Sequence, residues 1–249
     1  MSVWLACPSK RPPAEAEPIF AKWRERGYKI AIVTDDATWR GCDVQIIPPE
    51  YKGYAKSVNV LVEQIIKQDP DAEWIIAAAD DIEPDPNHTA EEIAAECSDH
   101  FAYHNSTGPQ MYHDTWKTKG LFGVMQPTGD RWGDAQGPYI DRVAGSAWLG
   151  REFCQRINQG RGPIWPEYFH MGEDEELQAV AIQYGVFWQR PDLIQYHAHW
   201  GRPREGEKMG QASRMPEFLR EANSPEHWAK YKKLFAERKA AGFPGSEPL

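Results

Sequence analysis

The chain has 249 residues, enough for one large α/β domain or two small ones, and its net charge of −9 excludes a general binder of polyanions. Its four cysteines show no paired spacing, which is typical of reduced thiols rather than of disulfides or a zinc site. No apolar run is long enough to span a membrane, and the N-terminus has no long apolar segment. We therefore expect a cytoplasmic protein without a membrane span.

The charge is divided unevenly along the chain. Residues 201–249 contain ten Lys/Arg and seven Asp/Glu, a net charge of +3, which leaves −12 on residues 1–200. A basic C-terminal segment of this kind indicates an anionic ligand or an anionic partner.

The first fifty residues alternate between strand and helix patterns. Short apolar runs predict strands at Val3–Cys7, Lys29–Thr34 and Val44–Ile47, and a helix between the first two ends at Gly27. Such a βαβ beginning favours a parallel sheet. Neither GxGxxG nor GxxxxGK[ST] is present, which argues against ordinary dinucleotide and P-loop sites.

The clearest helix pattern comes next. Five apolar residues recur on one helical face: Val58, Leu61, Val62, Ile65 and Ile66. Lys56 and Asn59 lie in the first turn, off that face, where solvated surface is the common role.

The segment Trp74–Pro86, WIIAAADDIEPDP, contains the most informative strand. Its apolar first half predicts a strand buried on both faces, and two prolines prevent the strand from continuing past Asp80 and Asp81. Ligands of open α/β sheets bind at the carboxyl ends of the strands. We therefore expect both carboxylates to lie at a binding site.

The middle of the chain is less regular. Helices are predicted around Thr89–Ser98 and Arg151–Asn158, and a strand at Leu121–Gln126 precedes a Gly/Asp-rich loop that carries Trp132. The small residues 145–147, Gly-Ser-Ala, indicate that the backbone approaches another group closely there.

A second acidic cluster, Glu173–Glu176, opens another predicted helix. The helix macrodipole favours acids in a first turn, but four in succession exceed what capping requires. After a predicted strand at Val186–Gln189, His197 and His199 would point to the same side of an extended segment. The chain ends with an amphipathic helix predicted at Pro225–Ala241.

The order of these segments resembles the GT-A glycosyltransferases, particularly those of family 2. The matching segments are the PSKR loop, the strand that ends in Asp35, the acids followed by IEPDP, AGSAWLGREF, HMGEDEEL and QYGVFWQRPDL, with a histidine afterwards. The resemblance implies an α/β fold with a Rossmann-like mixed, mostly parallel central sheet flanked by helices. The catalytic domain would span residues 1–200, and residues 201–249 would form a basic, helical C-terminal extension on or near the active site.

The resemblance also implies a reaction and its residues. The expected function is metal-dependent, inverting transfer of a sugar from a nucleotide-sugar donor, UDP-linked, to an acceptor hydroxyl. Asp174 would be the catalytic base, with Glu173 as the alternative. The implied donor-binding residues are Pro8, Ser9, Arg11, Asp35, Lys56, Asn59, Asp80, Gly145, Ser146 and Arg202. Trp132, Trp148 and Trp165 are candidates for stacking on the sugar or the acceptor.

One departure from the family concerns the metal, expected to be Mn²⁺ or Mg²⁺. The usual Asp-x-Asp falls on residues 78–80, where its first aspartate is missing. The carboxylate ligand stays open between Asp80 and Asp81, with Asp81–Glu83 as a second acid-x-acid triplet. His197 or His199 would complete the shell, and Mn²⁺ tolerates imidazole better than Mg²⁺.

Several alternatives stay open at this point. A sugar-1-phosphate nucleotidylyltransferase would begin with a GGxGxRL-type loop, where this chain has PSKRPP. A non-catalytic nucleotide or carbohydrate binder on the same fold would not need Asp174. The acceptor would be a glycan or a hydroxymethylated base in DNA. The basic residues Arg202, Arg204, Lys208 and Arg214 would either close over the donor as a lid or bind the phosphates of such DNA.

Overall fold

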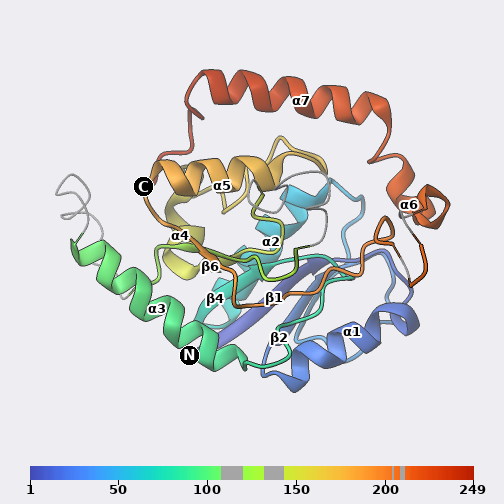
Figure 1. The fold of residues 1–249 in the computed structure, drawn as a ribbon, viewed down its shortest axis with the longest axis horizontal. Helices are drawn as coiled ribbons and strands as arrows, with labels where there is room; N and C mark the ends of the chain where they lie inside the picture. The colour runs from blue at the N-terminus through green and yellow to red at the C-terminus, as the bar shows by residue number, and fades with distance from the viewer. Residues whose placement is uncertain (108–119, 132–142, 204, 208–210) are drawn as a thin grey trace.

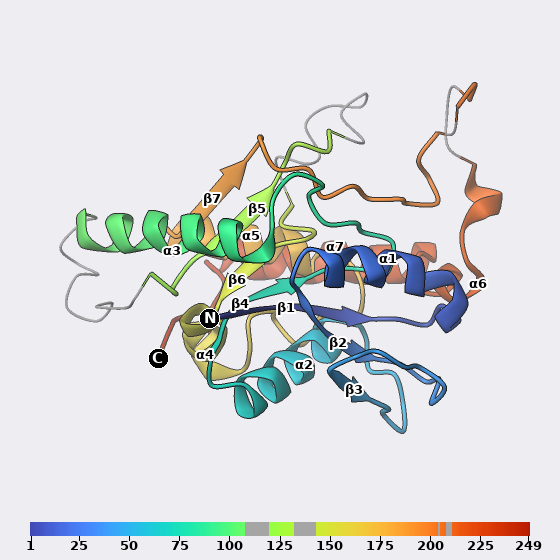
Figure 2. The same ribbon diagram turned by 90° about the horizontal axis from the view of Figure 1, so that it is seen from below.

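The computed structural model describes residues 1–107, 120–131, 143–203, 205–207 and 211–249, and within them one sheet lies between layers of helices (Figure 1, Figure 2). The strands are β1 (Ser2–Pro8), β2 (Lys29–Val33), β3 (Val44–Ile46), β4 (Ala72–Ala77), β5 (Val124–Pro127), β6 (Trp148–Gly150) and β7 (Phe187–Arg190). The helices are α1 (Pro13–Glu25), α2 (Tyr54–Gln68), α3 (Ala90–Thr107), α4 (Arg151–Arg156), α5 (Glu173–Gln183), α6 (Glu217–Arg220) and α7 (Pro225–Ala240), with short 3-10 helices at Ile157–Gly160 and Ala212–Arg214.

The sheet is mixed and mostly parallel, in the order β3-β2-β1-β4-β6-β5-β7. Strands β1, β2, β3 and β4 pair in parallel, as do β5 and β7. Only β6 runs antiparallel to its neighbours, β4 and β5, among the strands of the described residues. The predicted fold class is therefore confirmed: this is the GT-A-like α/β sheet that the sequence resemblance implies.

Apolar side chains cover both faces of the central strands, as the continuous apolar runs predict. Along β1, Trp4 and Ala6 enter one buried cluster, and Leu5 and Cys7 enter another on the opposite face. Helices α2, α4 and α5 cover the first face, and α1 and α3 cover the second. Figure 2 shows α2 and α4 on one side of the sheet and α1 and α3 on the other. The four cysteines are free thiols.

Several boundaries differ from those predicted. Strand β4 ends at Ala77, so Asp80 and Asp81 lie in the turn beyond it rather than at its last position. The sequence did not predict strand β6, since three residues are too few to show a period of two. Helix α3 continues to Thr107, well past the predicted end.

Helix α7 lies across the outer side of α5 (Figure 1), at residues 225–240 where a helix was predicted. Its Tyr231 and Leu234 pack against the cluster that contains Leu177 and Val180 of α5. Across the described parts of the chain, no helix combines the length and apolarity needed to cross a bilayer.

Candidate active site

A cleft of about 490 Å³ opens at the carboxyl ends of β1, β2 and β4. Its walls include Ser9 after β1, Asp35 after β2, and Asp80 and Asp81 after β4. The start of α5 adds Glu173 and Asp174 to the lining of the cleft. The cleft therefore lies where ligands bind in open α/β sheets.

Arg11 bridges the two carboxylates that follow β4. Its Nε donates to Asp80 Oδ1 (2.7 Å), and its Nη2 lies 3.1 Å from Asp81 Oδ2. The other oxygen of Asp80 accepts a hydrogen bond from Ser9 Oγ (2.7 Å). Burial raises the pKa of Asp80 despite the Arg11 charge, and the negative charge of Asp81 adds to this effect.

The two histidines lie beside this acid pair. His197 Nε2 is 3.2 Å from Asp81 Oδ1, and the His197 and His199 rings are 5.0 Å apart. Burial alone would raise the pKa of Asp81, but the hydrogen bond and charge of His197 outweigh it and the pKa is lowered. The pKa of His199 is lowered to about 4, because burial and the His197 charge both disfavour its cationic form.

The histidine segment is extended, as predicted, because it pairs with the turn after β4. Ile82 and His197 form an antiparallel bridge, and Ala198 N donates to Asp81 O (2.7 Å). Both imidazoles reach the same cleft. His197 and His199 therefore lie in one cleft, and their role as ligands stays a prediction.

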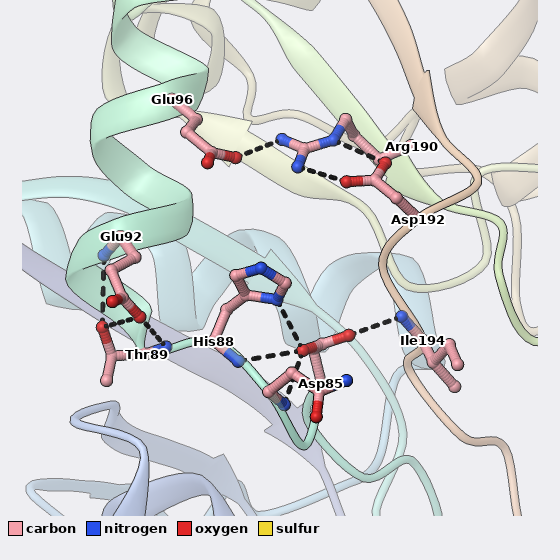
Figure 3. A network of polar contacts seen from close by, with 9 residues as sticks. Asp85, His88, Thr89, Glu92, Glu96, Arg190, Asp192 and Ile194 are labelled. Carbon is pink, nitrogen blue, oxygen red and sulfur yellow. Dashed lines mark hydrogen bonds and ion pairs between the residues drawn. The ribbon is translucent and has the colours of Figure 1, made fainter.

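Asp85, in the IEPDP turn, holds this segment in place (Figure 3). It is 1% exposed, and its carboxylate accepts hydrogen bonds from Ile194 N and His88 Nδ1, both 2.8 Å. Nearby, the Arg190 guanidinium pairs with Glu96 of α3 and with Asp192 (Figure 3). These contacts fix the chain between β7 and His197 against the loop that carries Asp80 and Asp81.

The four acids at the start of α5 divide into two pairs. Glu173 and Asp174 line the cleft. Glu175 accepts a hydrogen bond from Tyr231 Oη (2.9 Å), and Glu176 forms a buried ion pair with Arg238. The four acids therefore do more than cap the helix: the first two line the cleft, and the last two hold α7.

Asp174 lies against the small residues before β6. Its Oδ2 would be 3.9 Å from a Cβ atom added to Gly145, and Ala144 N donates to its backbone oxygen (3.2 Å). Its Oδ1 accepts from Glu175 N (2.8 Å). Burial raises the pKa of Asp174 to about 6, and the Glu175 charge contributes in the same direction.

The chemistry of the residues beside Arg11 suits a divalent cation. Two carboxylates and two imidazoles are ligands that Mn²⁺ takes, and Mg²⁺ would use the carboxylates. In the structure, Arg11 and Ser9 occupy three of the four carboxylate oxygens. The fourth, Asp81 Oδ1, is buried without a hydrogen-bond partner among the described residues, although His197 Nε2 lies 3.2 Å from it. No group of three or more His, Cys, Asp or Glu in the described ranges is arranged to hold an ion. A cation bound by both carboxylates would compete with Arg11.

Eleven of the residues expected at the site line this one cleft: Pro8, Ser9, Arg11, Asp35, Asp80, Asp81, Gly145, Glu173, Asp174, His197 and His199. Lys56 is exposed on α2, outside the cleft. Asn59 instead holds a cleft residue, because its side chain makes two hydrogen bonds to the Ile164 backbone (2.7 and 3.1 Å). Ser146 is buried, with its Oγ 3.3 Å from Gln126 Nε2.

Arg202 lines a second cavity of about 500 Å³, which shares Arg11, His199 and Trp200 with the first. Its guanidinium pairs with Asp130 and lies 4.2 Å from the centre of the Tyr196 ring. Arg202, in the basic C-terminal extension, therefore lies next to the first cleft rather than in its wall.

Two of the tryptophans proposed to stack on ligands are structural, and that prediction is wrong for them. Trp148 is fully buried and donates to Gln195 Oε1 (2.7 Å), and Trp165 lies under the Arg238 guanidinium at 3.4 Å. Trp132, Arg204 and Lys208 lie outside the described residues.

Other cleft residues escaped the sequence interpretation. Tyr51 and Tyr54 line the wall between β3 and α2, and Phe218 and Leu219 of α6 close another side. The tyrosines follow the end of a parallel strand, which is a signal that could have been used. Nothing in the sequence marks the α6 residues, because they reach the cleft only through the path of the C-terminal extension.

Comparisons with protein-family models and with curated proteins found no match. Among solved structures, the chain is similar to the catalytic domain of Drosophila beta1,4-galactosyltransferase 7 in complex with xylobiose. The identity is 16%, the match covers 84% of this chain and 74% of that one, and the TM-score is 0.45.

The chain is also similar to a glycosyltransferase involved in the glycosylation of the major capsid of PBCV-1. There the identity is 11%, 61% of each chain is covered, and the TM-score is 0.33. Both of these solved structures are glycosyltransferases. At these identities and scores, the likeness assigns no activity, ligand or residue role to this chain.

Proposed function

We propose that this protein is a glycosyltransferase that moves a sugar from a nucleotide-sugar donor to an acceptor hydroxyl. The observation that supports this most is the joint presence of two acid pairs in one cleft at the carboxyl edge of the sheet. One pair, Asp80 and Asp81, contacts Arg11 and His197; the other, Glu173 and Asp174, lines the cleft from the start of α5. A glycosyltransferase needs one environment that stabilises the diphosphate leaving group and another that accepts the proton of the acceptor hydroxyl.

Asp174 is proposed as the base that accepts the proton of the acceptor hydroxyl. A carboxylate with a raised pKa is a better proton acceptor than an ordinary one, while it stays ionised at neutral pH. A base on the wall opposite the leaving group implies inversion at the anomeric carbon, by the same geometry as two-carboxylate glycoside hydrolysis.

The diphosphate is proposed to lie at the other wall, near Ser9 and Arg11. Asp35 would contact the nucleobase or ribose of a UDP-linked donor. When bound by Asp80, Asp81 and the two imidazoles, Mn²⁺ or Mg²⁺ would neutralise the charge that develops on the diphosphate. The Arg11 side chain, released from the carboxylates, would then be free to face the phosphates.

The test is a screen of nucleotide sugars for slow hydrolysis by the purified protein, with Mn²⁺, with Mg²⁺ and with EDTA. We expect one class of donor to be hydrolysed with metal and not with EDTA, and Asp80→Ala to lose ~10²–10³-fold of that rate. Asp99→Asn, an exposed substitution on α3, is the matched control. If the protein binds a nucleotide sugar tightly but neither hydrolyses it nor transfers its sugar to any acceptor, the protein is a binding module.

The acceptor is proposed to be a glycan, with hydroxymethylated DNA as the alternative outcome of acceptor assays. A cytoplasmic location, which the four free thiols favour, is part of the same proposal.

A further inference from the structure

Glu173, the first residue of α5, carries a buried oxygen with no partner. The residue is 8% exposed and lines the cleft, and its Oε2 has no hydrogen-bond partner among the residues that the structure describes. Glu173 is not the N-cap of α5, because Gly172 occupies that position and the helix has no side-chain cap. Helix capping therefore does not explain why this carboxyl group is buried here. A buried polar atom without a partner is costly, so its presence on a cleft wall indicates a group that a ligand satisfies.

The surroundings of Glu173 disfavour an ionised carboxylate. Burial raises its pKa well above the usual value, and the charges that act on it, those of Asp174 and Glu175, are both negative. Tyr51 and Tyr54 line the same cleft as Glu173, and burial raises the pKa of each phenol. His170, also in the cleft, has a lowered pKa because it is buried.

We propose that Glu173 is a neutral carboxylic acid that hydrogen-bonds a hydroxyl group of the sugar carried by the donor, beside Asp174 as the base. This inference rests on the proposed function and assigns a substrate contact to a residue that the sequence offered only as a substitute base. A carboxylic acid both donates and accepts a hydrogen bond, and so does a sugar hydroxyl, so the two groups satisfy each other completely.

The position of Glu173 favours the donor sugar over the acceptor. Tyr54, which lies near Glu173, has its Oη 3.5 Å from Ala78 O, two residues before Asp80. Asp174 lies near Tyr54 too, but its Oδ2 lies beside Gly145, next to β6. The adjacent acids therefore have different immediate neighbours, which suits one proton donor and one proton acceptor.

The first experiment measures protonation without any substrate. Difference infrared spectra at pH 7 compare the wild type with Glu173→Gln, Asp174→Asn and Glu91→Gln, an exposed glutamate on α3. We expect the carbonyl band of a protonated carboxyl group to disappear in Glu173→Gln and to remain in the other two. If Glu173→Gln removes only an ionised-carboxylate band, Glu173 is charged and the inference is overturned.

The second experiment measures binding by calorimetry, with UDP, UDP-glucose and UDP-galactose as probes. We expect Glu173→Ala to weaken binding of the preferred UDP-sugar by about tenfold, as for one lost hydrogen bond, and to leave UDP binding unchanged. Glu173→Gln keeps a donor and an acceptor, so it should stay within about threefold of the wild type. Thermal unfolding of each variant checks that the fold is intact.

The outcomes separate this inference from the proposed function. If the wild type binds a UDP-sugar and Glu173→Ala binds it equally well, only the role of Glu173 is overturned. Equal loss of UDP and UDP-sugar also overturns it, because the residue would then support the cleft rather than the sugar. If the wild type binds none of the three probes, the UDP-linked donor is wrong and the sugar contact falls with it, whatever the infrared result.

Discussion

At the scale of single residues, the cleft contains two pairs of adjacent acids in different surroundings. Asp80 and Asp81 contact Arg11 and His197; these contacts outweigh burial and lower the pKa of Asp81, whereas burial raises the pKa of Asp80 despite the Arg11 charge. Glu173 and Asp174 are buried beside further acids, and burial raises the pKa of both. Two acid pairs of similar composition therefore have different partners, and variants of each pair should differ in what they change.

The first prediction concerns Asp174. Asp174→Asn should lower kcat by ~10²–10⁴-fold and leave donor affinity nearly unchanged, as expected for loss of a general base. Steady-state kinetics with Asp99→Asn as the control measure this. A large loss of kcat in Glu173→Gln together with a small loss in Asp174→Asn would show that Glu173, and not Asp174, is the base.

The same residue determines the pH dependence of turnover. The base must be ionised to accept a proton, and burial raises the pKa of Asp174 to about 6. The kcat of the wild type should therefore rise with pH up to about 6 and fall about tenfold for each pH unit below it. The residual activity of Asp174→Asn should lack this limb; if the limb persists, another group produces it.

The second prediction concerns Arg11 and the metal. Because Arg11 occupies oxygens of both carboxylates, Arg11→Ala should raise the affinity for Mn²⁺ by about tenfold or more, while weakening donor binding. Electron paramagnetic resonance of free Mn²⁺ gives the affinity. Arg24→Ala, which removes an arginine paired with Glu17 on α1, is the matched control. Unchanged Mn²⁺ affinity in Arg11→Ala would show that the ion binds elsewhere.

At the scale of elements, α5 connects the cleft to the C-terminal extension. Its first two acids face the cleft, and Glu176, 2% exposed, accepts hydrogen bonds from Tyr168 Oη (2.7 Å) and the Arg238 guanidinium (2.6 Å). Arg238 belongs to α7 and lies over the Trp165 ring. The helix that presents Asp174 is thus fixed from its other side by the last helix of the chain.

The third prediction follows from this buried pair. Arg238→Met should lower the free energy of unfolding by ~3–5 kcal/mol, because it leaves the Glu176 charge buried without its cation. Adding Glu176→Gln should recover part of the loss, since no charge is then stranded. Urea unfolding measures both. Arg220→Met removes an exposed pair with Glu217 and should change nothing measurable; an equal loss there would contradict the role of burial.

At the scale of the whole molecule, charge and shape favour a small anionic ligand over a duplex. Residues 1–200 carry −12, and in the basic extension Arg202 and Arg214 are paired with Asp130 and Glu207. The same extension brings α6 to the cleft wall. A segment that already forms ion pairs and lines the cleft is better placed to cover a donor than to follow a DNA backbone.

The fourth prediction is therefore a contrast in salt dependence. Binding of the UDP-sugar should change little with salt, and hydroxymethylated and plain duplexes should not bind even at low salt. Each phosphate contact on a duplex adds roughly −0.9 to the slope of log K against log salt. Gel-shift and calorimetric titrations decide the matter, and a steep slope with the hydroxymethylated duplex would establish DNA as the acceptor.

Local patterns in the sequence determined much of this protein. The buried run before Asp80, the helical period of α2 and the acids that open α5 each depend on residues close together in the chain. They predicted the α/β class, most of the elements, and the position of Asp174 at the start of a helix; Asp80 lies in the turn just past its predicted strand. The alternation of side chains along an extended segment also placed His197 and His199 on one side.

The tertiary structure alone decided which partners these groups have. Arg11 meets Asp80 across 69 residues, Arg238 meets Glu176 across 62, and β6 exists because it pairs with β4 and β5. The burial of Trp148 and the orphaned oxygen of Glu173 likewise depend on what surrounds them in space. Burial, charge pairing and pKa are properties of a three-dimensional neighbourhood, and a local pattern of residues contains no measure of it.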